Sequence, residues 1–136
     1  MDRSFNRDIG ELEAIHAATA EFFRQHGTDA AILTHVDLAI EELFVNMVTH
    51  NHDTRHPIRI EMASAGRGVE VSLTDHEAEP FDPTRPTPLD LSLPLSRRSP
   101  HGMGLYLVSK MVDSVQFRHS GRESRITFVK RGAGDA

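Results

Sequence analysis

The chain has 136 residues, of which 38% are hydrophobic and 26% charged, and this composition suits a single domain spanning residues 1–136. It contains no cysteine, which excludes disulfides and thiolate metal sites and fits a reducing cytoplasm. The net charge of −5 argues against general nucleic-acid binding, which needs a basic surface. The N-terminus is polar and no apolar run approaches the roughly 18 residues of a membrane span, so we expect neither a signal peptide nor a membrane partner.

Two amphipathic helices are predicted in the first part of the chain. Apolar residues at helical spacing indicate the first helix over residues 9–26, with Gly27 as its C-cap. Thr28 or Asp29 is placed to cap the second helix, which we expect to run to about His50.

Alternating apolar and polar residues predict two β-hairpins in the remainder. The first has strands around residues 58–62 and 69–73, and the second has strands around 115–117 and 126–128. A short helix opening at Gly102 precedes the second hairpin. This order predicts an α+β fold, a two-layer α/β sandwich whose mostly antiparallel sheet is covered by helices on one face.

A proline-rich segment, residues 76–101, separates the hairpins and holds six of the seven prolines. Long irregular segments inside a compact domain are uncommon and often serve as functional lids. The alternative is a disordered insertion, against which stands an alternating row of leucines that needs a surface to pack on: Leu89, Leu91, Leu93 and Leu95.

Three polar residues are candidates for chemistry. Glu42 and Asn46 lie four residues apart on the second helix and therefore share a face. A carboxylate can act as a general base, and an amide oxygen suits Mg²⁺. Asp75 ends a strand in step with its apolar residues, where a carboxylate can accept a hydrogen bond from an adenine amino group. The simpler alternatives are a solvated polar helix face and a turn-forming aspartate.

The sequence Gly102-Met103-Gly104 precedes the short predicted helix. Glycines at a helix N-terminus let backbone N–H groups approach phosphate oxygens, and the helix dipole favours anions there. The alternative is a flexible junction between loop and helix.

A group of histidines near the end of the second helix invites a metal-binding interpretation. The group comprises His50, His52 and His56, with Asp53 nearby. Their spacing matches no closed zinc site, so we do not predict a function based on metal alone.

The order of these motifs resembles the histidine-kinase-like ATPase superfamily and, within it, the short anti-sigma-factor serine kinases of bacterial partner-switching systems. The stretch AIEELFVNMVTH is similar to their N box, LTDHEAEPFDP to their first glycine box, and HGMGLYLVSKMVD to their second. The resemblance covers roughly residues 8–130, and the agreement of several ordered motifs with the predicted elements makes it specific to the family.

The resemblance implies the Bergerat ATP-binding fold and a role for each candidate. Asn46 would ligand Mg²⁺ between the ATP phosphates, and Glu42 would deprotonate the incoming hydroxyl. Asp75 would bind the adenine amino group, with Thr127 near the adenine.

The same resemblance places Gly102, Met103 and Gly104 at the ATP phosphates, where the lid closes. It also implies partners. The usual substrate of the family is a serine or threonine on a STAS-domain anti-sigma-factor antagonist, the usual second partner is a sigma factor, and these kinases commonly form homodimers.

Two departures from the family pattern bear on function. The family's Asp-x-Gly sequence is missing, because His76, Glu77 and Ala78 follow Asp75, and an ungapped match would instead put His76 at the aspartate position. His101 replaces a glycine at the start of the phosphate loop. Besides an active kinase, the sequence therefore leaves open a non-catalytic partner-binding protein on the same fold, or a regulatory ATPase module that serves another signalling protein.

Overall fold

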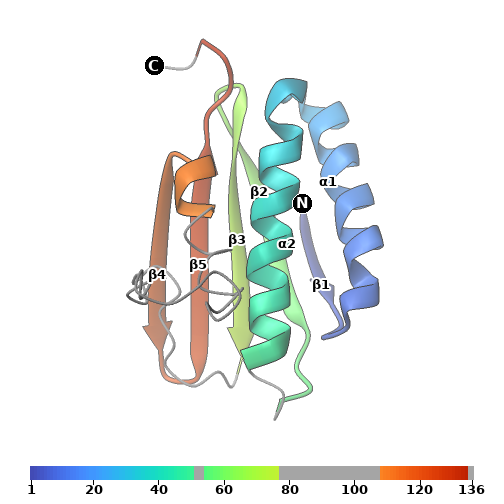
Figure 1. The fold of residues 1–136 in the computed structure, drawn as a ribbon, viewed down its shortest axis with the longest axis vertical. Coiled ribbons are helices and arrows are strands. Elements are labelled where there is room, and N and C mark those ends of the chain that lie inside the picture. The colour runs from blue at the N-terminus through green and yellow to red at the C-terminus, as the bar shows by residue number, and fades with distance from the viewer. Residues whose placement is uncertain (51–53, 77–107, 135–136) are drawn as a thin grey trace, which may run out of the picture.

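The computed structural model describes residues 1–50, 54–76 and 108–134, which form a five-stranded sheet with two long helices on one face (Figure 1). The strands lie in the order β1-β2-β3-β5-β4, and each neighbouring pair is antiparallel. The strands are β1 (Asp2–Phe5), β2 (Ile58–Ala65), β3 (Gly68–His76), β4 (Ser114–Ser120) and β5 (Glu123–Lys130). This architecture confirms the predicted α+β sandwich.

The helical layer consists of α1 (Leu12–His26) and α2 (Leu33–His50), each preceded by a short 3-10 turn, η1 (Ile9–Glu11) and η2 (Ala30–Ile32). Gly27 ends α1 in the left-handed conformation, with φ of 60°, as predicted for a glycine C-cap. Of the two residues predicted as the next cap, Asp29 takes the role, because its side chain accepts a hydrogen bond from the Ala31 N–H at 3.0 Å.

The core lies between α2 and the sheet. The apolar stripe of α2 is buried over its whole length: Val36, Ala39, Ile40, Leu43, Phe44 and Met47. It packs against the inward residues of the strands, among them Ile60 of β2, Val71 of β3 and Phe128 of β5, all fully buried. Burial of a large apolar side chain contributes roughly 1.5–3 kcal/mol, so this layer fixes where α2 sits over β3.

Both predicted hairpins are present, and a glycine allows them to pair closely. β3 joins β5 across the centre of the sheet, with Asp75 opposite Ser124 in the register. At the start of β3, a Cβ on Gly68 would lie only 2.1 Å from the carbonyl oxygen of Lys130. Gly68 therefore permits a backbone approach that any side chain would block.

The edge strand β1 is absent from the prediction. It pairs with β2, with Phe5 opposite Ile58, and the Phe5 ring is only 2% exposed. Three of its four residues are exposed, so the strand lacks the alternating apolar pattern that predicts the hairpins.

The short helix before the last hairpin is described over residues 108–111, where Val108 and Val112 are buried as predicted. Its predicted start at Gly102 and nearly all of the segment 76–101 lie outside the described residues. Within the described ranges, no helix is both long enough and apolar enough to cross a membrane.

Candidate functional site

The C-terminal half of α2 carries Glu42 and Asn46 on one face, as their spacing predicts. Glu42 is half-buried, whereas Asn46 is only 3% exposed. The side-chain oxygen Oδ1 of Asn46 is buried and accepts no hydrogen bond from any residue that the structure describes. A buried amide oxygen without a partner is costly and asks for an explanation, such as a bound cation.

The end of β3 brings Asp75 to the same end of the molecule, because α2 and β3 run in the same direction (Figure 1). Asp75 is 3% exposed and in phase with Val71 and Leu73, so it faces the helical layer. His76 follows directly and therefore faces the other way, where its ring lies 3.7 Å from a Glu123 carboxylate oxygen. The register thus puts Asp75, not His76, between the layers.

Arg7 meets Asp75, a contact that the sequence pattern did not reveal. The Arg7 guanidinium forms an ion pair with Asp75 through Nη2, and both side chains are buried. Its Nη1 donates to the carbonyl oxygen of Met47 on α2 at 3.1 Å, and its Nε donates to the carbonyl oxygen of His56 at 2.9 Å. Burial lowers the pKa of Arg7, although an arginine stays charged in any ordinary buffer.

Thr127 lies away from Asp75. It is opposite Ser72 in the register, and the two hydroxyl oxygens are 2.9 Å apart. Because faces alternate along a strand, Ser72 and Thr127 point away from the face that holds Asp75.

Ser124 is the hydroxyl residue that the register places directly opposite Asp75, on the same face. It is buried, and its Oγ lies 2.8 Å from the Nδ1 atom of His119. Counting in steps of two from Ile126 and Phe128 would have identified Ser124, since buried residues of β5 share one face.

The remaining predicted site residues, Gly102, Met103 and Gly104, lie outside the described part of the chain. So do His52 and Asp53 of the histidine group. Among the residues that are described, no group of three or more His, Asp or Glu side chains is arranged to hold a metal ion.

The residues fit Mg²⁺ and a nucleotide in two respects. Asn46 offers a buried oxygen of the hard type that Mg²⁺ prefers, and one such protein ligand is enough when phosphates and water supply the others. Asp75 offers a buried carboxylate that can accept a hydrogen bond from a base. The fit is incomplete at Asp75, since Arg7 already forms an ion pair with it.

The helices α1 and α2 packed on one face of the antiparallel sheet define the class as a two-layer α/β sandwich. Residues 5–130 match the model of the histidine kinase-like ATPase domain, and the chain belongs to this family.

Comparison with solved structures gives a similar fold. The crystal structure of the RsbU and RsbW domains of Rv1364c from Mycobacterium tuberculosis matches with a TM-score of 0.68 and 19% sequence identity. The match covers 96% of this chain and 32% of that one, so the chain spans about a third of the length of this relative. No curated protein matches the chain significantly.

Proposed function

We propose that the chain is an ATP-dependent protein serine/threonine kinase that acts as an anti-sigma factor in the cytoplasm. Its substrate would be a STAS-domain antagonist, its second partner a sigma factor, and its working form a homodimer. The observation that carries the proposal is the buried Oδ1 of Asn46, which has no hydrogen-bond partner among the described residues and lies one helical turn from Glu42. Membership of the histidine kinase-like ATPase family supports ATP as the nucleotide.

Each site residue receives one task. Asn46 would hold Mg²⁺ through Oδ1, and the ion would supply charge neutralisation to the phosphates. Asp75 would accept a hydrogen bond from the adenine amino group. Gly102, Met103 and Gly104 would bind the phosphates through their backbone N–H groups.

In the reaction, the substrate hydroxyl oxygen forms a bond to the γ-phosphorus while the bond between that phosphorus and the β–γ bridging oxygen breaks. ADP leaves, and the hydroxyl proton passes to a carboxylate oxygen of Glu42. The half-buried position of Glu42 leaves it reachable by a hydroxyl of a partner protein.

Two measurements test the proposal. Calorimetric titration with ATP and Mg²⁺ should show micromolar binding, which Asn46→Ala should abolish. Glu42→Gln should keep nucleotide affinity yet lose phosphotransfer to a STAS-domain protein by about 10²-fold or more, the scale of general-base catalysis.

Glu41→Gln is the matched control for Glu42→Gln, since Glu41 is the adjacent acid and lies instead 3.9 Å from His16 Nε2. It should retain full kinase activity. A Glu42→Gln protein with the wild-type rate would remove Glu42 as the base, and unchanged affinity in Asn46→Ala would remove Asn46 as the Mg²⁺ ligand.

A second candidate function is a partner-binding protein without catalysis. It is favoured by the Arg7–Asp75 ion pair and by His76-Glu77-Ala78 in place of the glycine that the family has after its aspartate. Retained partner binding, together with no nucleotide binding at millimolar ATP, would support this function over the kinase.

A further inference from the structure

Arg7 occupies a position between the two layers of the fold. Its three guanidinium nitrogens contact three segments: the carbonyl oxygen of Met47 on α2, the carbonyl oxygen of His56 before β2, and the carboxylate of Asp75 at the end of β3. The side chain is only 8% exposed although it belongs to a segment that follows the edge strand β1. One side chain therefore ties the N-terminal segment to both layers at the end that holds Asn46.

Stability alone is a weak reason for such a contact. A buried ion pair loses about as much free energy through desolvation as it gains, and an apolar side chain of similar volume often serves as well. Arg7 also lies on the one buried carboxylate that the proposed function assigns to the nucleotide base.

The guanidinium and an adenine amino group both need a hydrogen-bond acceptor. Both donate N–H groups to an acceptor oxygen, and a planar guanidinium resembles a base edge in shape. Because Arg7 binds Met47 on the helix and Asp75 on the sheet, it fills the space between layers that a base must enter to reach Asp75.

We propose that Arg7 is an internal competitor of the nucleotide base: it occupies Asp75 in the free protein and must leave before adenine binds there. This inference rests on the proposed function, because it takes Asp75 as the base-binding residue. The protein then exists in a closed state with Arg7 on Asp75 and an open state with Arg7 released. Nucleotide affinity is reduced by the fraction of molecules that are closed.

The inference gives Arg7 a specific effect on affinity. If fewer than about one molecule in ten is open, removal of the competitor should tighten ATP binding about tenfold or more. The same gain should appear with adenosine, which carries the base without phosphates and so isolates Asp75 from the Mg²⁺ site.

The first experiment titrates Arg7→Met with ATP and Mg²⁺, and separately with adenosine, beside the wild type. Arg59→Met is the matched control, because this substitution removes the same charge from an exposed ion pair. In that pair, Nη2 of Arg59 lies 2.6 Å from Oδ2 of Asp2 on β1. We expect tighter binding of both ligands by Arg7→Met and no change in Arg59→Met.

The second experiment needs no variant and decides the matter if Arg7→Met does not fold. The Nε–H signal of Arg7 is followed by NMR in the isotope-labelled wild type during titration with ATP. Loss of its hydrogen bond to the His56 carbonyl at saturation supports release of Arg7, and an unchanged signal at saturation overturns the inference.

The two proposals fail in different ways. If the wild type binds ATP and Arg7→Met binds it no more tightly, the competitor role of Arg7 is overturned while the kinase proposal stands. No binding by either protein at millimolar ATP overturns the nucleotide-binding proposal and the competitor with it. Binding by Arg7→Met alone is the strongest support for both.

Discussion

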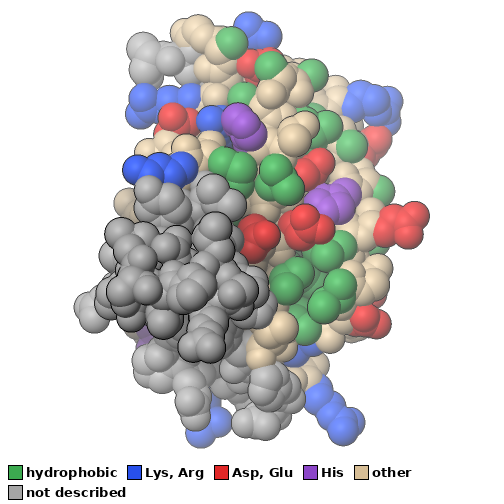
Figure 2. Space-filling view, viewed as in Figure 1, with side chains coloured by type: hydrophobic (Ala, Val, Ile, Leu, Met, Phe, Trp, Pro, Cys, Tyr) green, Lys and Arg blue, Asp and Glu red, His purple; other side chains and the backbone are tan. Residues whose placement is uncertain are grey.

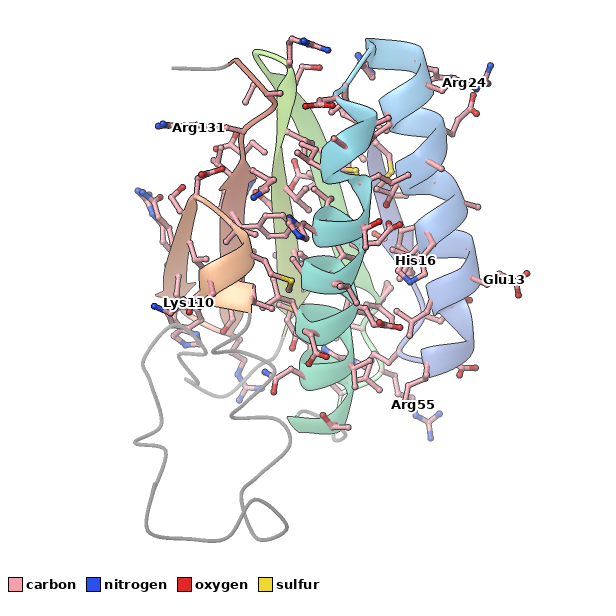
Figure 3. All side chains as sticks on the ribbon, turned by 45° about the horizontal axis from the view of Figure 1, so that its top comes forward. Glu13, His16, Arg24, Arg55, Lys110 and Arg131 are labelled. Carbon is pink, nitrogen blue, oxygen red and sulfur yellow. The ribbon has the colours of Figure 1, made fainter. Side chains whose placement is uncertain are left out.

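Two aspartates of the helical layer have pKa values shifted in opposite directions. Burial raises the pKa of Asp37, which is 27% exposed; His16 Nδ1, 3.2 Å from its Oδ1, acts against this, and Glu41 adds to the rise. His16 points from α1 toward α2 (Figure 3), and acidic side chains surround a histidine on the helical face (Figure 2). The pKa of Asp29 is lowered by hydrogen bonds from the N–H groups of Ala133, at 2.7 Å, and Ala31.

These shifts predict opposite dependences of stability on pH. A carboxyl group whose pKa is raised by folding contributes stability below its pKa in the unfolded chain, near 3.9. That contribution is lost as the pH rises through its pKa in the folded protein. Asp37→Asn should therefore become more stable relative to wild type between pH 3.5 and pH 7. A lowered pKa contributes stability above the unfolded value, so Asp29→Asn should lose stability relative to wild type over the same range.

Urea denaturation at several pH values measures both effects, and each variant serves as the control for the other. The change from carboxylate to amide also alters helix propensity, but that offset does not vary with pH. Parallel pH profiles for the two variants would contradict the assignment of opposite shifts.

The positions of some candidate residues on their elements could be predicted from the sequence, because these positions depend on local periodicity. Glu42 and Asn46 follow from helical spacing, and Asp75 follows from its phase with the apolar residues of β3. The resemblance implies Thr127 near the adenine, whereas the phase of the apolar residues in β5 places Ser124, not Thr127, on the face of Asp75. Arg7 could not be predicted, because its contact with a residue 68 positions away depends on how β1 docks.

At the scale of elements, β1 contributes to the core mainly through Phe5. Its ring is buried and packs within the main cluster, while the strand itself has only four residues. Phe5→Ala should lower the free energy of unfolding by about 3–5 kcal/mol, because it removes a buried ring and leaves a cavity.

Ile9 provides the comparison for Phe5. It is also an apolar residue of the N-terminal segment, but it is 52% exposed, so Ile9→Ala should change stability by no more than about 0.5 kcal/mol. Chemical denaturation of both variants makes the measurement. Equal effects would show that β1 is not held by its aromatic residue.

The elements that the sequence predicted share a strong pattern, and those it missed lack one. α1 and α2 carry apolar stripes, with Gly27 and Asp29 as recognisable caps. In β2 and β3, apolar and polar residue types alternate along the sequence on either side of the turn. The predicted helix over residues 9–26 instead begins as the 3-10 turn η1, which Asp8 caps through a hydrogen bond from the Gly10 N–H at 2.9 Å. Periodicity does not distinguish that turn from a first turn of α-helix.

At the scale of the whole molecule, the arrangement of layers follows from the order of elements, because a hairpin-rich sheet with amphipathic helices has few ways to bury their apolar faces. The order of elements does not predict which strands form the edges of the sheet. β1 and β4 form the two edges, and β1 reaches its place through contacts with β2 that are distant in sequence.

The last prediction uses stability to separate structural from functional roles at Asn46. A ligand that binds only the folded protein adds about 2.7 kcal/mol to the free energy of unfolding at a concentration one hundred times its dissociation constant. Wild type should show this gain with ATP and Mg²⁺. Asn46→Ala should show none, yet without nucleotide it should be at least as stable as wild type, because the substitution removes a buried oxygen that has no partner among the described residues.

Urea denaturation of both proteins, with and without ATP and Mg²⁺, gives the four free energies needed. A variant that is less stable without nucleotide but keeps the full gain would make Asn46 a structural residue of the core. A variant that is as stable as wild type without nucleotide, yet is not stabilised by ATP and Mg²⁺, would show that Asn46 serves binding and not stability. A buried oxygen without a protein partner is tolerated where a ligand supplies one.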